Sequence, residues 1–115
     1  MQIDFEELKS VMIAVRSKTG DEDSFEITSK DCNLSNKKIY FYLELLEDDG
    51  LIKIYDRVEQ LHEVMIHRMT SQGFRTLEAM MNDNIWNKIK KQAAELGIEA
   101  LKQIPSLAIQ LLSKD

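Results

Sequence analysis

Two adjacent lysines and two aromatic residues fall within one turn of a predicted helix. Lys37 and Lys38 lie at the start of this helix, just after Asn36, and Tyr40 and Phe41 follow them. Free backbone N–H groups at a helix N-terminus and ammonium groups both attract a phosphate, and an aromatic ring can contact a thymine methyl group or stack on an unpaired base. These residue types therefore predict contact with nucleic acid.

The net charge of the same helix opposes that prediction. Residues 35–50 contain two lysines and four acidic residues, so the segment carries 2 − 4 = −2. Affinity for DNA depends largely on cations that neutralise phosphates. Two interpretations stay open: the aromatic residues contact DNA, or they contact another part of the fold or a partner protein.

Residues typical of catalysis or metal binding occur without the neighbours such sites need. Cys32 has no adjacent base, helix N-terminus or metal-ligand pattern. His62 and His67 lie outside any cluster with ligand spacing, and the acidic groups at 21–23 and 47–49 fall in a loop and at a helix end. We expect a non-enzymatic protein without a metal or other cofactor.

Apolar spacing and capping residues define the elements of the first half. A helix over 5–17 follows Asp4, which can cap it, and a short strand is expected at 25–27 before a helical turn within 28–33. Ser35 is a strong N-cap for a helix that runs to Asp49, with Gly50 ending it in a left-handed conformation. The side of this helix expected to face the core carries Ile39, Tyr42, Leu43 and Leu46.

The second half begins with a predicted hairpin and continues as helices. The strands are expected at 51–55 and 64–69, and Thr70 caps a helix over 71–82. Asp83 or Asn84 caps a fifth helix, in which Trp86 is expected to lie in the core, and the apolar tail at 98–112 is interrupted by Pro105.

The order helix, strand, turn, helix, hairpin and further helices predicts the fold class. It is typical of a winged helix, a helix-turn-helix whose hairpin is the wing. We predict a mainly α-helical α+β domain with a small β-hairpin and additional C-terminal helices. Residues 1–83 would form the core, and residues 84–115 an extension packed on the same domain or on a dimer partner. In such a fold the hairpin can add basic residues to the DNA-contacting helix, so the full candidate set is Asn36, Lys37, Lys38, Tyr40, Phe41, Lys53 and Arg57.

Two stretches carry a resemblance to a known family. They read LSNKKIYFYLELLEDDGLI and HRMTSQGFRTLEAMMNDNIWNKIKK. The chain resembles the bacterial and phage proteins grouped as domain of unknown function 2513. The most specific matches are Thr70, Gly73, Leu77, Asp83, Trp86, Lys88 and Lys90. The chain departs from the family pattern at Phe74 and Met81. The resemblance implies a winged-helix fold and a prophage or mobile-element setting, and it transfers no functional residue.

Composition limits the class of protein. The 115 residues are 43% hydrophobic and 30% charged, with a formal net charge of −5 and one cysteine. This is typical of a single soluble domain without disulfides. The sequence contains neither a signal-like apolar run near residue 1 nor 18 consecutive apolar residues, so we expect a cytoplasmic location and no membrane contact.

The tail contains more apolar residues than a small domain needs to cover one side. An apolar surface of this kind usually marks an interface, and a two-fold homodimer is the commonest solution. The candidate interface residues are Leu101, Ile104, Leu107, Ala108, Leu111 and Leu112. The alternative is that the tail folds back over the first helix.

Two function hypotheses follow. The first is a DNA-binding transcriptional regulator with a winged-helix fold that binds double-stranded DNA as a homodimer. The alternative is a protein–protein adaptor that has the same fold without affinity for DNA.

Overall fold

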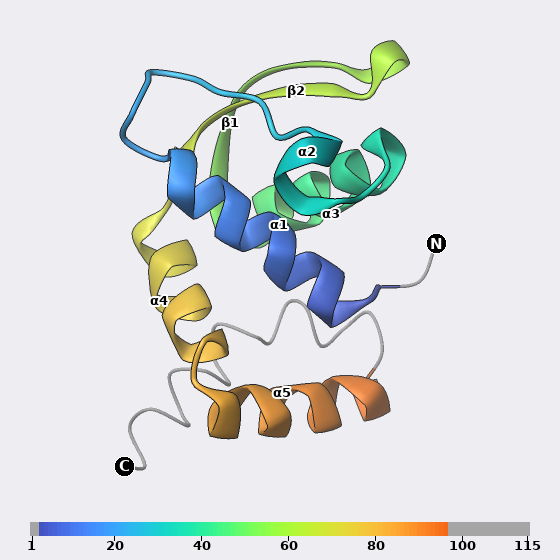
Figure 1. Ribbon diagram of the computed structural model, residues 1–115, viewed down its shortest axis with the longest axis vertical. Helices are drawn as coiled ribbons and strands as arrows, with labels where there is room; N and C mark the ends of the chain where they lie inside the picture. The colour runs from blue at the N-terminus through green and yellow to red at the C-terminus, as the bar shows by residue number, and fades with distance from the viewer. Residues whose placement is uncertain (1–2, 97–115) are drawn as a thin grey trace.

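The computed structural model describes residues 3–96, and residues 92–96 only by their backbone. The described chain forms five helices and one antiparallel hairpin (Figure 1). In chain order these are α1 (Phe5–Lys18), α2 (Ser29–Cys32), α3 (Asn36–Asp48), β1 (Ile52–Val58), a short 3-10 turn (Glu59–Leu61), β2 (Glu63–Met69), α4 (Ser71–Met80) and α5 (Asp83–Leu96).

The helices of the first half begin where the sequence predicts. The Asp4 side chain accepts hydrogen bonds from the amides of Glu6 and Glu7 at the start of α1. The Ser35 hydroxyl accepts one from the Lys38 amide at the start of α3. Gly50 has a φ of +73° after α3, a conformation that costs glycine little. The predicted caps are therefore confirmed, as is the predicted inner face of α3, whose four residues are all buried.

The hairpin is longer than predicted, and the strand at 25–27 is shorter. β1 and β2 pair from Ile52 opposite Met69 to Val58 opposite Glu63, with two irregularities near Ile54. The polar residues after Tyr55 concealed this extension of β1. The predicted strand reduces to one bridge, in which Phe25 and Ile66 exchange two backbone hydrogen bonds of 2.9 and 2.8 Å.

The start of α4 is confirmed, and the start of α5 differs from the prediction. The Thr70 hydroxyl accepts from the Gly73 amide at 3.1 Å. α4 ends at Met80, which frees Asn82 to cap α5 by accepting from the amides of Asn84 and Ile85. The predicted caps, Asp83 and Asn84, are thus wrong, because the preceding helix stops two residues earlier than expected.

The core lies around α1, which packs against α2, α3, α4 and β2 (Figure 1). Trp86 of α5 is 3% exposed, as predicted, and it belongs to the same hydrophobic cluster as the buried residues of α1. Among the described residues, no helix has the length and apolarity needed to cross a membrane.

Candidate interaction surface

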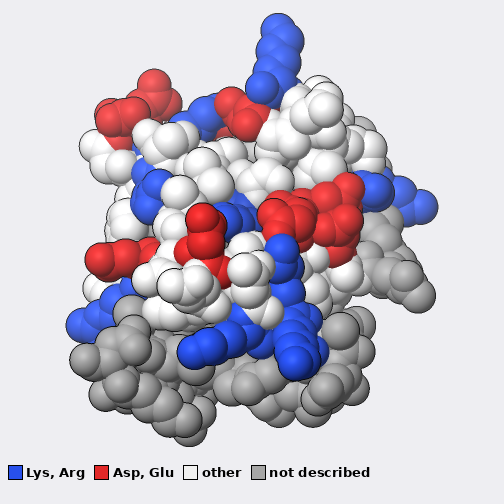
Figure 2. Space-filling model, turned by 60° about the horizontal axis from the view of Figure 1, so that its bottom comes forward, with Lys and Arg blue, Asp and Glu red and all other residues white. Residues whose placement is uncertain are grey.

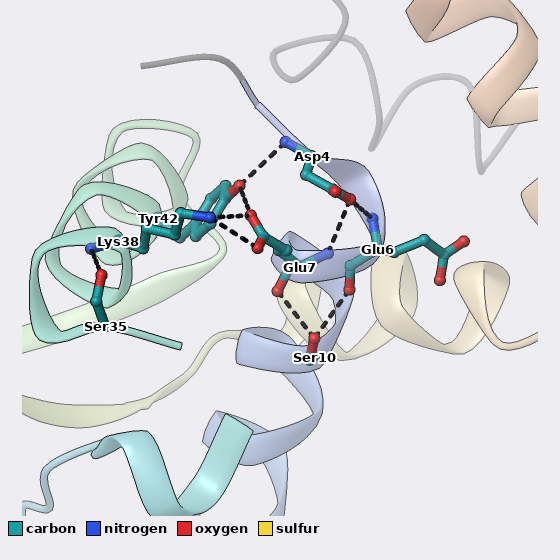
Figure 3. Close-up of polar contacts among 7 residues, drawn as sticks. All are labelled: Asp4, Glu6, Glu7, Ser10, Ser35, Lys38 and Tyr42. Atoms are coloured by element: carbon teal, nitrogen blue, oxygen red, sulfur yellow. Dashed lines mark hydrogen bonds and ion pairs between the residues drawn. The ribbon is translucent and has the colours of Figure 1, made fainter. Parts of the chain in front are cut away.

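The Lys38 side chain on the first turn of α3 reaches α1, and it stays 44% exposed. Its Nζ lies 3.0 Å from Oε2 of Glu7 (Figure 3). The contact joins the start of α3 to the start of α1. The ammonium group that was predicted to contact a phosphate is therefore paired with a carboxylate of the same chain.

The buried hydroxyl of Tyr42 completes this junction. It accepts a hydrogen bond from the Asp4 amide at 3.0 Å and donates one to Oε1 of Glu7 at 2.9 Å (Figure 3). Burial, together with the Glu7 hydrogen bond, raises the pKa of Tyr42 to about 12. Glu7 thus serves both Lys38 and Tyr42, so its position depends on two residues of α3.

Arg57, another candidate for contact with DNA, also pairs with acidic residues of the chain. Its guanidinium pairs with the Glu47 carboxylate, and Nη1 lies 3.6 Å from Oε1 of Glu44. The hydrogen bond to Glu47 is the main reason that the pKa of Arg57 is raised. The two partners are one turn apart on α3, so Arg57 fastens β1 to that helix.

Tyr40 and Phe41 contact other parts of the fold, as one of the two interpretations of the sequence expected. Both are half-buried and pack against the core. The turn at the end of the hairpin brings the His62 ring to the Tyr40 ring, with 5.2 Å between centroids, while Phe41 meets the ring of Tyr42. A hydrogen bond to Glu44 is the main cause that raises the pKa of Tyr40. The hairpin beside α3 supplies the ring contact of Tyr40, which the sequence of the helix alone does not indicate.

The other three candidates for DNA contact are exposed. Asn36 and Lys37 lie together at the start of α3, and Lys53 lies opposite Arg68 near the base of the hairpin. Within residues 3–91, neither Lys37 nor Lys53 forms an ion pair. Of the seven candidates, Tyr40 and Arg57 both contact Glu44. Lys53 lies at the other end of β1 from Arg57.

The hairpin and its turn expose three apolar residues that were not among the predicted site residues. Tyr55, Val58 and Leu61 are 71%, 41% and 62% exposed. We call these three residues the hairpin patch. The sequence places these apolar residues at every third position from 55 to 61, but Tyr55 was expected to end its strand and the other two were assigned to a loop.

Basic and acidic side chains are interspersed on the side of the molecule turned forward in Figure 2. Between α1 and α5, the Trp86 indole N–H donates to Oε1 of Glu6 at 2.7 Å, and the Lys90 ammonium donates to the same oxygen at 2.9 Å. Lys9 and Lys90 lie 5.3 and 5.7 Å from the ring centroid. The hydrogen bonds from Lys90 and Trp86 lower the pKa of Glu6. These contacts hold α5 on α1.

Cys32 has the environment of a structural residue. Its thiol contacts the Thr28 carbonyl oxygen at 3.7 Å, and burial raises its pKa, which disfavours the reactive thiolate. In the part of the chain with described side chains, no group of three His, Cys, Asp or Glu residues could hold a metal ion. The candidate dimer residues, Leu101 to Leu112, lie outside the described residues.

A family model described as "Hypothetical protein (DUF2513)" matches residues 2–99. The chain belongs to this family. The resemblance drawn from the sequence is thus confirmed, and the DUF2513 match includes every element described above. An uncharacterized protein of Haemophilus influenzae is 24% identical over 114 residues, which cover 95% of this chain and 96% of the relative. No solved structure matches.

The most specific DUF2513 residues of the chain have structural roles here. Thr70 caps α4, Gly73 lies against the backbone of Leu51, and Trp86 and Lys90 bind Glu6. These four positions hold elements together.

Proposed function

We propose that the protein is a non-enzymatic protein-interaction module with a winged-helix arrangement, in which α3 and the hairpin form the binding surface. The order of the elements supports this arrangement, and the bridge between Phe25 and Ile66 joins the segment between α1 and α2 to the hairpin. The adaptor hypothesis is therefore preferred to the DNA-binding regulator.

The observation that carries the proposal is the pairing of Arg57 with Glu44 and Glu47. An exposed ion pair is worth no more than about 1 kcal/mol, so a phosphate could displace it at little cost. The displaced carboxylates would remain on α3, beside the DNA backbone, and repel it. Lys38 is likewise paired, with Glu7 of α1. At these contacts, three acidic residues thus face two cations.

The hairpin patch supports contact with a protein. An exposed tyrosine, valine and leucine on β1 and the turn that follows it offer apolar area to a partner, and exposed apolar residues commonly mark interfaces. Duplex DNA gains little from such residues unless they enter a groove. A partner protein would cover them and release water.

Site-specific photo-crosslinking tests this function. The photoreactive residue p-benzoylphenylalanine would replace Leu61 in the hairpin patch, and a matched variant would carry it at Phe74, which is 39% exposed on α4. We expect a discrete protein adduct from position 61 in cells of the source organism and none from position 74. Adducts to DNA alone, or the same protein adduct from both positions, would overturn the proposal.

DNA binding is the second candidate function, and the exposed pair Asn36 and Lys37 favours it. Both lie on the first turn of α3, where backbone amides and an ammonium group can meet a phosphate. A salt-titrated binding assay on random duplex DNA tests this candidate, because real phosphate contacts give a steep salt dependence. Loss of that binding in Lys37→Glu, combined with Lys53→Glu, would favour the regulator. Lys38 is left unchanged because it holds α1.

The homodimer remains a separate proposal. Its candidate residues include Leu107 and Leu111. Replacing both by lysine would abolish association while circular dichroism stays unchanged if they form an interface, and would unfold the domain if they form its core. Light scattering at several concentrations provides the measurement.

A further inference from the structure

A small pocket opens between the start of α3, the segment before α2 and the start of β2. Its volume is about 120 Å³. Because drug-sized ligands occupy roughly 300–1,000 Å³, this pocket suits one side chain and not a cofactor or a metabolite of that size. The pocket is therefore a place where a partner protein could anchor a single residue.

The floor and the rim of the pocket differ in polarity. The floor contains Ile39 and Leu43 of α3 and Val64 of β2, all buried. The rim contains two exposed acidic residues, Glu26 from the segment before α2 and Glu63 from the start of β2. An occupant must therefore combine an apolar stem with a polar end.

The two rim carboxylates determine the charge of that end. Within the described side chains, the carboxylates of Glu26 and Glu63 form no hydrogen bond and no ion pair. An apolar side chain would shield them from water without compensation, and an anion would be repelled. A cation satisfies both, so electrostatic complementarity selects a basic residue.

We infer that this pocket binds a basic side chain of a partner protein, with arginine as the best fit. Arginine has a long apolar stem and a planar, weakly hydrated guanidinium group with five donors, which can serve two carboxylates at once. The Asn36 side chain and the His62 ring also line the pocket and offer further acceptors. The inference rests on the proposed function and specifies the chemistry of the partner.

The position of the pocket adds a second requirement for that partner. His62 of the pocket lining directly follows Leu61 of the hairpin patch. A segment that inserts an arginine between α3 and β2 would thus bring its neighbouring residues over Leu61. The partner is expected to carry an arginine next to an apolar residue.

Methyl NMR with two probes tests the inference on the full chain. The probes are Nα-acetyl-arginine amide and Nα-acetyl-citrulline amide, which is similar in shape but uncharged. The arginine probe should shift the methyl signals of Ile39, Leu43 and Val64, and the citrulline probe should bind about tenfold more weakly. Absence of these shifts, or equal binding of both probes, would overturn the inference.

Variants of the rim provide the second arm. The double variant Glu26→Gln, Glu63→Gln should weaken binding of the arginine probe about tenfold, because two exposed charge contacts are lost. Glu59→Gln, in the turn between the strands and outside the pocket lining, should leave it unchanged. Unchanged affinity in the double variant would refute the pocket. If the arginine probe does not bind but the crosslink from position 61 still forms, the pocket proposal is refuted and the proposed function stands. If the probe binds but the crosslink does not form, the hairpin patch is refuted as the interface.

Discussion

Gly73 lies directly against the carbonyl group of Leu51. A Cβ atom at position 73 would stand 2.1 Å from the Leu51 oxygen and 2.7 Å from Cγ of Met69. The first turn of α4 therefore approaches the start of the hairpin more closely than any side chain allows. This contact explains why a glycine fits at position 73, since the position lies in a helix and needs no unusual backbone angle.

Replacing Gly73 by alanine should destabilise the protein. Alanine favours a helix over glycine by about 1 kcal/mol, but the new methyl group meets backbone that cannot move aside without shifting the hairpin. Overpacking of this kind costs about 1–3 kcal/mol, and more when backbone is involved. We expect a net loss of about 2 kcal/mol in urea unfolding. The exposed neighbour Gln72→Ala is the control, and equal stability of the two variants would contradict this account.

The Thr70 hydroxyl makes two contacts at the same junction. It accepts from the Gly73 amide at 3.1 Å and donates to the Gly50 carbonyl oxygen at 2.6 Å. Loss of an N-cap costs about 1 kcal/mol, and Thr70→Ala also removes the bond to Gly50, so we expect about 1–2 kcal/mol. Thr70→Ser keeps both bonds and should retain most of the stability in the same unfolding measurement.

Tyr42 makes the stability of the fold depend on alkaline pH. The pKa of its hydroxyl is about 12 in the folded chain, against about 10 when unfolded. Between these values the folded chain binds more protons, so the free energy of unfolding falls as pH rises. The contribution, about 2–3 kcal/mol, is complete below pH 10 and is lost as pH passes through 12.

Tyr42→Phe isolates this contribution. The variant should lose about 1–2 kcal/mol at neutral pH, because the Asp4 amide and Glu7 each lose a hydrogen-bond partner. Urea unfolding at pH 8 and pH 11 should then show a smaller fall in stability for the variant than for the wild type. An equal fall in both would mean that other groups carry the alkaline transition.

Neutralising the acidic partners of Arg57 should increase affinity for duplex DNA. Glu44→Gln with Glu47→Gln removes two negative charges from α3 and frees the guanidinium. Binding to random duplex DNA should rise, with a salt dependence that disappears in a triple variant that also carries Arg57→Gln. Unchanged binding in the double variant would show that the ion pairs do not control access to phosphates.

Local signals in the sequence predicted the elements well, and long-range contacts limited the prediction of the site. Asp4, Ser35 and Thr70 cap helices as expected, because a cap acts within its own turn. Lys38 could not be recognised as the partner of Glu7, which is 31 residues earlier, nor could His62 be placed on Tyr40. The sequence identified the candidate residues of α3. Contacts with α1 and the hairpin, which are distant in sequence, determine which of these side chains are paired within the chain.

The contacts between Glu6 and α5 also have a consequence for the order in which the chain folds. Glu6 meets Trp86 and Lys90 across 80 and 84 residues of sequence. During synthesis α1 is made early, yet one of its sides stays uncovered until α5 has been translated. Closing so long a loop costs conformational entropy, and this cost is offset only when the contacts between α1 and α5 have formed. Docking of α5 should therefore be a late step, and the exposed side of α1 is where a nascent chain would need protection from aggregation.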